Sequence, residues 1–177
     1  APPANAYARK WTTPQLARDR LAYNSYMHAA VRDALPPINV HSDEYSRLPT
    51  GYSMVYYKTA TMLFNLQYTL GDSLFQGALR HYFAQWKFKH PYMEDMRQSF
   101  TDHAKTDLNW FFDQWIETGK RLDYAVKGVK HRKADSGQVI HFRRIGEMQM
   151  PIDFTVTAND GKQYGYHIPN TWFVKKT

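Results

Sequence analysis

The chain has 177 residues, of which 43% are apolar and 22% charged, and its formal net charge is +7. This composition is typical of a folded globular domain and excludes a disordered tail. The sequence has no cysteine, which excludes a disulfide scaffold, a thiolate zinc finger and a cysteine nucleophile. No stretch approaches about eighteen consecutive apolar residues, so we expect neither a membrane span nor a signal peptide.

Helical patterns with short connections occupy the first two thirds of the chain. Residues 13–35 follow a helical apolar period, which begins with a cap and a proline at Thr13-Pro14 and ends at Pro36-Pro37. A wider apolar face covers residues 52–70 and ends at Gly71. Both segments are therefore predicted to be amphipathic helices.

Three further helices are predicted downstream. An apolar stripe over 74–86 follows Asp72-Ser73, either of which is a suitable N-cap. A shorter stripe over 93–100 continues the pattern. Asp107 is a cap for the last helix, whose aromatic stripe is expected in the core, and Gly119 lies just beyond its end. Five helices with short links predict a helical bundle or superhelix.

From Leu122 onward the apolar period changes to two, which is typical of strands. Four strands separated by turn residues are predicted, at roughly 122–132, 138–145, 148–157 and 162–168. We expect them to form one antiparallel β meander. Residues 172–177 also have the pattern of a strand that expects a partner, so the chain looks truncated. We predict an α+β fold with a helical part at 1–120 and the start of a β-rich domain at 121–177.

Positive charge concentrates in this strand region. Up to Lys120 the sequence has 13 basic and 11 acidic residues, and from Arg121 on it has 10 and 5. Basic residues interleaved with Tyr124, Phe142 and Tyr164 are what a nucleic-acid surface needs. Because charges spread over several strands are more typical of a solvated sheet face, no nucleic-acid partner is expected.

Motifs for several chemistries are missing from the sequence. It has no G-x-G-x-x-G, no G-x-x-x-x-G-K, no G-x-S-x-G and no H-E-x-x-H. Two histidine–carboxylate pairs have helical spacing, His90 with Glu94 and His103 with Asp107. Each pair supplies two ligands where a catalytic zinc needs three and an open position. We therefore expect no metal site within the chain itself.

A series of motifs in fixed order carries the strongest functional signal. The series comprises Tyr56-x-Lys58, L-G-D-S-L-F at 70–75, A-L-R-H-Y-F at 78–83 and D-L-N-W-F-F-D-Q-W at 107–115. This order resembles the gluzincin zinc aminopeptidases, the family of aminopeptidase N and leukotriene hydrolase. The resemblance covers residues 52–126 well and the later strands loosely.

The resemblance implies both a fold and an activity. The fold is the C-terminal half of a thermolysin-like catalytic domain, followed by a truncated β-sandwich-like domain. In the family, H-E-x-x-H and a glutamate of a following helix hold the zinc whose activated water attacks the peptide carbonyl. Because those ligands precede the Y-x-K segment, the resemblance implies that they lie upstream of Ala1. This chain is then a C-terminal fragment that binds no zinc and is inactive alone.

One catalytic residue is expected within the chain. Tyr56 aligns with the family tyrosine whose hydroxyl donates to the oxyanion of the tetrahedral intermediate, a role that suits a neutral phenol. A register shift of one would give the role to Tyr57, but Tyr56-x-Lys58 keeps the tyrosine-to-lysine spacing. Thr59 stands where the family usually has glycine. The alternative is a core aromatic at position 56. For Lys58 and Tyr52 two interpretations stay open. Either their side chains line the same wall of the site as Tyr56, or they have packing and surface roles.

Partners and location are implied only through the family. The resemblance implies a peptide substrate and, as a second partner, the missing N-terminal part of the same chain. Bacterial relatives are often exported, so an extracytoplasmic or periplasmic location is favoured by analogy. An alternative function is a non-catalytic peptide- or protein-binding module derived from a peptidase. The residues that set side-chain preference are expected upstream.

Overall fold

The computed structural model describes residues 14–32, 35–45, 51, 53–132 and 137–173. The chain divides after Gly119 into two compact units, the first built of helices and the second of strands. This arrangement of helices followed by antiparallel strands confirms the predicted α+β class. No helix in the described ranges is both long and apolar enough to cross a lipid bilayer.

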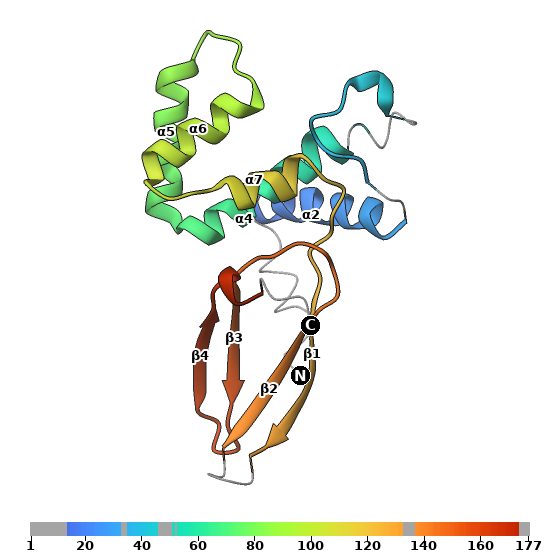
Figure 1. Cartoon of the computed structure of the whole chain (residues 1–177), viewed down its shortest axis with the longest axis vertical. Helices are drawn as coiled ribbons and strands as arrows, with labels where there is room; N and C mark the ends of the chain where they lie inside the picture. The colour runs from blue at the N-terminus through green and yellow to red at the C-terminus, as the bar shows by residue number, and fades with distance from the viewer. Residues whose placement is uncertain (1–13, 33–34, 46–50, 52, 133–136, 174–177) are drawn as a thin grey trace. The chain divides into compact units, whose positions relative to one another are not determined.

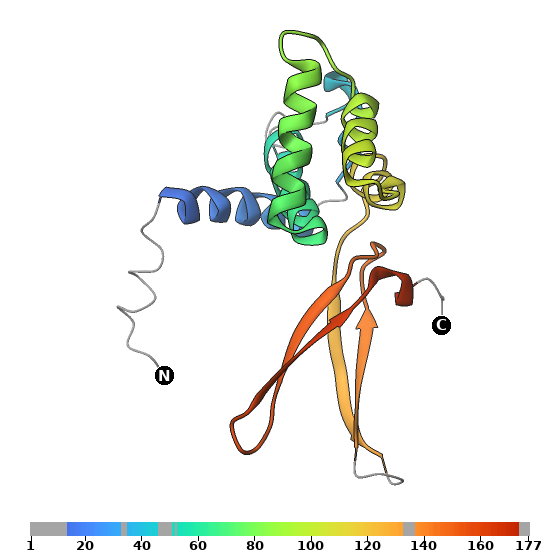
Figure 2. The ribbon, with the colours of Figure 1, turned by 90° about the vertical axis from the view of Figure 1, so that its left-hand side faces the viewer.

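The helical unit contains the predicted helices close to their expected bounds (Figure 1). In chain order, they are α2 (Pro14–Arg32), the 3-10 turn η1 (Ser42–Glu44), the π-helix η2 (Ser53–Lys58), α4 (Thr59–Leu70), α5 (Asp72–Trp86), α6 (Met93–Ala104) and α7 (Asn109–Ile116). Helices α5 and α6 lie side by side in both ribbon views (Figures 1 and 2). The expected cap Thr13 lies outside the described residues.

Gly71 makes the corner between α4 and α5. Its φ of 77° lies in the left-handed region, which glycine adopts without the strain of a Cβ atom. Gly71 is at once the C-cap of α4 and the N-cap of α5, and no side chain caps α5. The predicted cap at Asp72-Ser73 was therefore wrong. The sharp corner instead lets Asp72 Oδ1 accept a hydrogen bond from Gln67 Nε2 at 2.8 Å.

Side-chain capping is present at the next two helices. Asp95 Oδ2 accepts a hydrogen bond from the backbone N–H of Tyr92, 2.8 Å away, at the start of α6. Asp107 Oδ1 accepts one from the backbone N–H of Asn109, at 2.9 Å. Asp107 therefore satisfies a helix N–H as predicted, although Leu108 occupies the N-cap position of α7.

The core of the helical unit is largely aromatic. Phe111, Phe112 and Trp115 of α7 are at most 1% exposed, as their helical spacing predicted. The ring of Phe100, from α6, meets Phe112 edge-on with centroids 6.3 Å apart. Such edge-to-face pairs stabilise a core beyond their area burial by about 1 kcal/mol each. Helix α7 is therefore packed as a central element of this unit.

The second unit contains four strands in two hairpins (Figure 2). Strand β1 (Tyr124–His131) pairs antiparallel with β2 (Gln138–Arg144), and β3 (Ile152–Thr157) pairs antiparallel with β4 (Gln163–Ile168). The strands match the predicted ranges, except that the third begins only at Ile152. In the described residues they form two two-stranded sheets rather than one continuous four-stranded ladder.

The segment between β2 and β3 explains this difference. The backbone N–H groups of Ile145 and Gly146 donate to the carbonyl of Asp123, and that of Met148 donates to Arg121. These bonds fold the segment back onto the residues before β1, so it does not continue as a strand beside β2. Met148 is fully buried by this turn.

The chain beyond β4 does not continue as the predicted strand. Residues Asn170–Phe173 form a 3-10 turn, η3, in which the N–H of Trp172 donates to the carbonyl of Pro169 at 3.1 Å. The Phe173 ring packs on Tyr124, with centroids 5.0 Å apart. The strand prediction was therefore wrong for 172–173, and its remaining residues, 174–177, lie outside the described part.

Candidate functional site

The Y-x-K motif lies on a π-helix rather than on a regular α-helix. Residues Ser53–Lys58 form this wide turn, and α4 follows directly from Thr59. The sequence predicted one continuous helix over 52–70, of which Tyr52 lies outside the described residues. Single π-turns within helices occur frequently at functional sites, because the wide turn alters which side chains share a face.

Tyr56 and Lys58 lie on opposite sides of this turn. The Tyr56 side chain is 60% exposed, whereas Lys58 is 0% exposed. Tyr56 is therefore not the core aromatic that the alternative interpretation supposed. Tyr57, the alternative for the catalytic role, is half-buried.

Side-chain hydrogen bonds to backbone carbonyls run along the helix that follows the π-turn. The Thr61 hydroxyl donates to the carbonyl of Tyr57, Asn65 Nδ2 donates to the carbonyl of Thr61, and the Thr69 hydroxyl donates to that of Asn65, each at 2.8 Å. Thr61 is itself buried. These bonds to carbonyls four residues earlier connect successive turns from the π-helix into α4.

Lys58 reaches into the interior of the helical unit. Its Nζ donates to the carbonyl oxygen of Thr118 at 2.8 Å and to that of Pro36 at 3.4 Å. Burial of the side chain lowers the pKa of the Lys58 ammonium from 10.5 to about 8, because removal from water disfavours the charged form. The sequence left open whether Lys58 lines the wall, has a packing role or lies at the surface, and the structure places its side chain in the interior.

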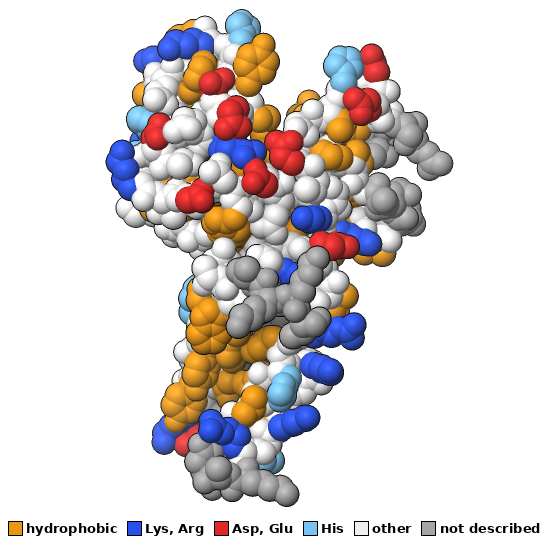
Figure 3. All heavy atoms as spheres, viewed as in Figure 1, with side chains coloured by type: hydrophobic (Ala, Val, Ile, Leu, Met, Phe, Trp, Pro, Cys, Tyr) orange, Lys and Arg blue, Asp and Glu red, His pale blue; other side chains and the backbone are white. Residues whose placement is uncertain are grey.

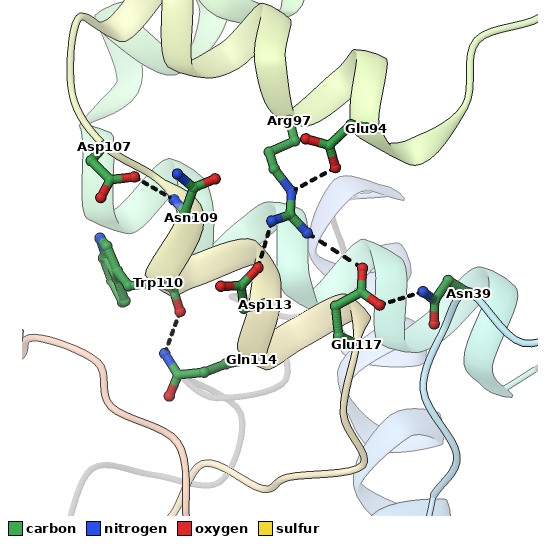
Figure 4. A network of polar contacts seen from close by, with 9 residues as sticks. All are labelled: Asn39, Glu94, Arg97, Asp107, Asn109, Trp110, Asp113, Gln114 and Glu117. Carbon is green, nitrogen blue, oxygen red and sulfur yellow. Dashed lines mark hydrogen bonds and ion pairs between the residues drawn. The ribbon is translucent and has the colours of Figure 1, made fainter.

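A second polar cluster joins α6 to α7 around Arg97 (Figure 4). Its guanidinium forms ion pairs with Glu94, Asp113 and Glu117, and Asn39 Nδ2 donates to the other carboxylate oxygen of Glu117. The Arg97 side chain is 13% exposed and lies over the Phe112 ring. Figure 3 shows acidic side chains gathered on the face of the helical unit turned toward the viewer. Sequence reasoning missed this cluster because two of its three pairs join residues far apart in the chain.

The described residues do not fit a catalytic zinc site. No group of three or more histidine, aspartate and glutamate side chains in the described part comes together as a metal would require. Glu94, one member of the histidine–carboxylate pairs noted in the sequence, instead faces Arg97 at 3.2 Å. His103 packs on the ring of His81, with centroids 5.4 Å apart. No metal chemistry is therefore derived from these side chains.

Comparison with known families addresses the helical unit. The family model described as the Peptidase family M1 domain matches residues 5–115. The chain belongs to the M1 peptidase family. This match confirms the resemblance to the gluzincin aminopeptidases. It supports a peptidase as the protein to which these residues belong. The family is in general zinc-dependent. The matched region includes the π-helix, α4 to α6 and most of α7. No curated protein matches the chain.

Proposed function

We propose that this chain forms part of the catalytic domain of a zinc-dependent aminopeptidase, in which Tyr56 donates a hydrogen bond to the oxyanion of the tetrahedral intermediate. Membership of the M1 family supports the peptidase activity. The exposure of Tyr56 on the π-helix is the observation that carries the role of its hydroxyl, because a donor must reach the substrate. The substrate class is peptides, cleaved at the amino-terminal residue.

The chemistry of a phenol suits this role. Negative charge develops on the carbonyl oxygen as the peptide bond is attacked, and a neutral hydroxyl aimed at that oxygen stabilises the transition state more than the substrate. Removing one such donor from comparable oxyanion sites costs about 3 kcal/mol, or roughly 100- to 1000-fold in kcat. The donor is carried by a π-helix that continues directly into α4, rather than by a loop.

The metal-binding part of the site is proposed to come from residues other than these 177. The sequence has no H-E-x-x-H, and its described residues hold no group suited to zinc. We therefore propose that residues 1–120 complete a catalytic domain whose zinc ligands and general base lie elsewhere in the protein, and that the chain alone is inactive. Residues 121–177 would begin a separate β-rich domain.

The test is a pair of single-atom changes in the active enzyme. Tyr56→Phe should lower kcat for a fluorogenic aminoacyl amide by roughly 100- to 1000-fold, with zinc content and KM nearly unchanged. Tyr57→Phe is the matched control and should change kcat by less than about 3-fold. An unchanged kcat in Tyr56→Phe would remove the proposed role, and a selective loss in Tyr57→Phe would transfer it to that neighbour.

A further inference from the structure

Lys58 is buried although its side chain ends in an ammonium group. Its side chain is 0% exposed, and among the described residues its two acceptors are backbone carbonyls rather than carboxylates. Burying an ammonium group without a negative partner is unfavourable, and replacing buried charges by well-packed apolar residues is often neutral or stabilising. A lysine at this position therefore indicates a need for directed hydrogen bonds.

The two acceptors of Lys58 belong to segments that run together. Pro36 lies in the segment 35–39 and Thr118 in the segment 116–119, which we call jointly the clamp. The N–H of Ile38 donates to the carbonyl of Ile116 at 2.9 Å. Asn39 and Glu117 are joined through their side chains in the same region (Figure 4). The Lys58 ammonium thus donates to both segments of the clamp, which are also joined to each other by these other hydrogen bonds.

The clamp connects distant parts of the sequence to the π-helix. Lys58 is 22 residues from Pro36 and 60 from Thr118. It is also the last residue of the π-helix, two positions after Tyr56. π-Helices are rare and occur mostly as single turns inside α-helices, so contacts with other segments bear on the geometry of this turn. The bonds of Lys58 are such contacts, and they act on the side of the turn opposite the exposed Tyr56.

We propose that Lys58 is a positioning residue, whose ammonium group between the carbonyls of Thr118 and Pro36 fixes the π-helix and thereby the direction in which Tyr56 is presented. This inference rests on the proposed role of Tyr56. Misplacement of a reacting group by about 1 Å costs roughly 100-fold in rate. The effect of Lys58 therefore falls on kcat and passes through the Tyr56 hydroxyl.

A double-mutant cycle in the active enzyme tests this dependence. Lys58→Met should lower kcat by about 10- to 100-fold, with KM and zinc content within about 3-fold of the parent. In a Tyr56→Phe background the same change should lower kcat by less than about 3-fold, because the group it positions is already gone. Lys87→Met, at an exposed lysine, is the control and should leave kcat unchanged.

The outcomes separate this inference from the proposed function. If Tyr56→Phe leaves kcat unchanged, the proposed function fails, and this inference fails with it. If Tyr56→Phe loses activity while Lys58→Met does not, or if Lys58→Met has the same effect in both backgrounds, only the positioning role is overturned. Should Lys58→Met not fold, Lys58→Gln, which keeps an amide donor, takes its place in the cycle. If neither folds, Lys58 is a folding residue and the inference is wrong.

Discussion

Gly119 packs directly against the carbonyl oxygen of Leu35. An added Cβ atom at position 119 would overlap that oxygen, and no flexible side chain is there to move aside. Leu35 is itself buried, so its backbone is held in place. The clamp that receives Lys58 therefore closes only because position 119 has no side chain. The sequence suggested a helix-ending role for this glycine, whereas the structure shows a requirement for close approach.

This contact predicts the effect of one added methyl group. Gly119→Ala should lower the free energy of unfolding by about 1–3 kcal/mol, since the two clamp segments must separate. Urea unfolding followed by tryptophan fluorescence measures the change. Gly165→Ala is the control, because nothing lies within 4 Å of its added Cβ, and it should be neutral or slightly stabilising. Equal losses in both variants would contradict the close approach at Gly119.

The burial of Lys58 predicts an alkaline rise in stability. Its pKa is about 8 in the folded protein and 10.5 in the unfolded chain. Below pH 8 both states are protonated, and the folded state bears the full cost of the buried charge, about 3 kcal/mol. Between pH 8 and 10.5 the unfolded chain binds more protons, so the free energy of unfolding increases with pH.

Urea unfolding between pH 7 and 10 tests this rise, with Lys58→Met as the reference that lacks it. Burial raises the pKa values of Tyr45, Tyr82 and Tyr124, so their effect is opposite and begins only near pH 10. The comparison with Lys58→Met isolates the lysine, because both proteins share these tyrosines. Parallel pH profiles for the two proteins would show that Lys58 does not titrate as its burial implies.

The carboxylates around Arg97 predict that removing its charge lowers the free energy of unfolding in a salt-dependent way. Arg97→Gln leaves Glu94, Asp113 and Glu117 close together without a cation, so we expect a loss of about 1–2 kcal/mol at low salt. High salt should recover part of it by screening the repulsion. Lys162→Gln removes an exposed pair with Asp160 and should leave the stability nearly unchanged at either salt concentration. A loss in Arg97→Gln that salt does not change would argue against this electrostatic origin.

The hydrogen bonds of Tyr124 predict that removing its hydroxyl destabilises the strand unit. Its hydroxyl accepts from the N–H of Met150 at 2.9 Å and lies 3.2 Å from the carbonyl of the same residue. Tyr124→Phe leaves both groups without this partner, which should cost about 1–2 kcal/mol. Thermal unfolding measures the loss, and Tyr164→Phe, at a half-exposed position, is the matched control. If the two variants have the same melting temperature, the hydrogen bonds between the Tyr124 hydroxyl and Met150 do not stabilise the strand unit.

Periodicity was sufficient to predict the helices and strands but not their connections. The stripes of α5 and α7 are local patterns that repeat every three or four residues, so the sequence reveals them directly. The return of residues 145–148 onto Arg121 and Asp123 depends on backbone bonds across more than twenty positions, and no local pattern encodes it. A packing role for Lys58 was one of the alternatives that the sequence left open, and no local pattern selects it, because its acceptors are carbonyls that every residue has.

The wide turn at Ser53–Lys58 also bears on how related sequences should be aligned. A π-turn arises when one residue is inserted into a regular helix, so a relative with an ordinary helix there would be one residue shorter. The correct comparison would then need a single-position gap inside an otherwise unbroken motif. Such a gap is the same size as the offset between Tyr56 and Tyr57. The Tyr56-x-Lys58 spacing places such a gap so that Tyr56 keeps its register, and superposition of backbones tests that placement.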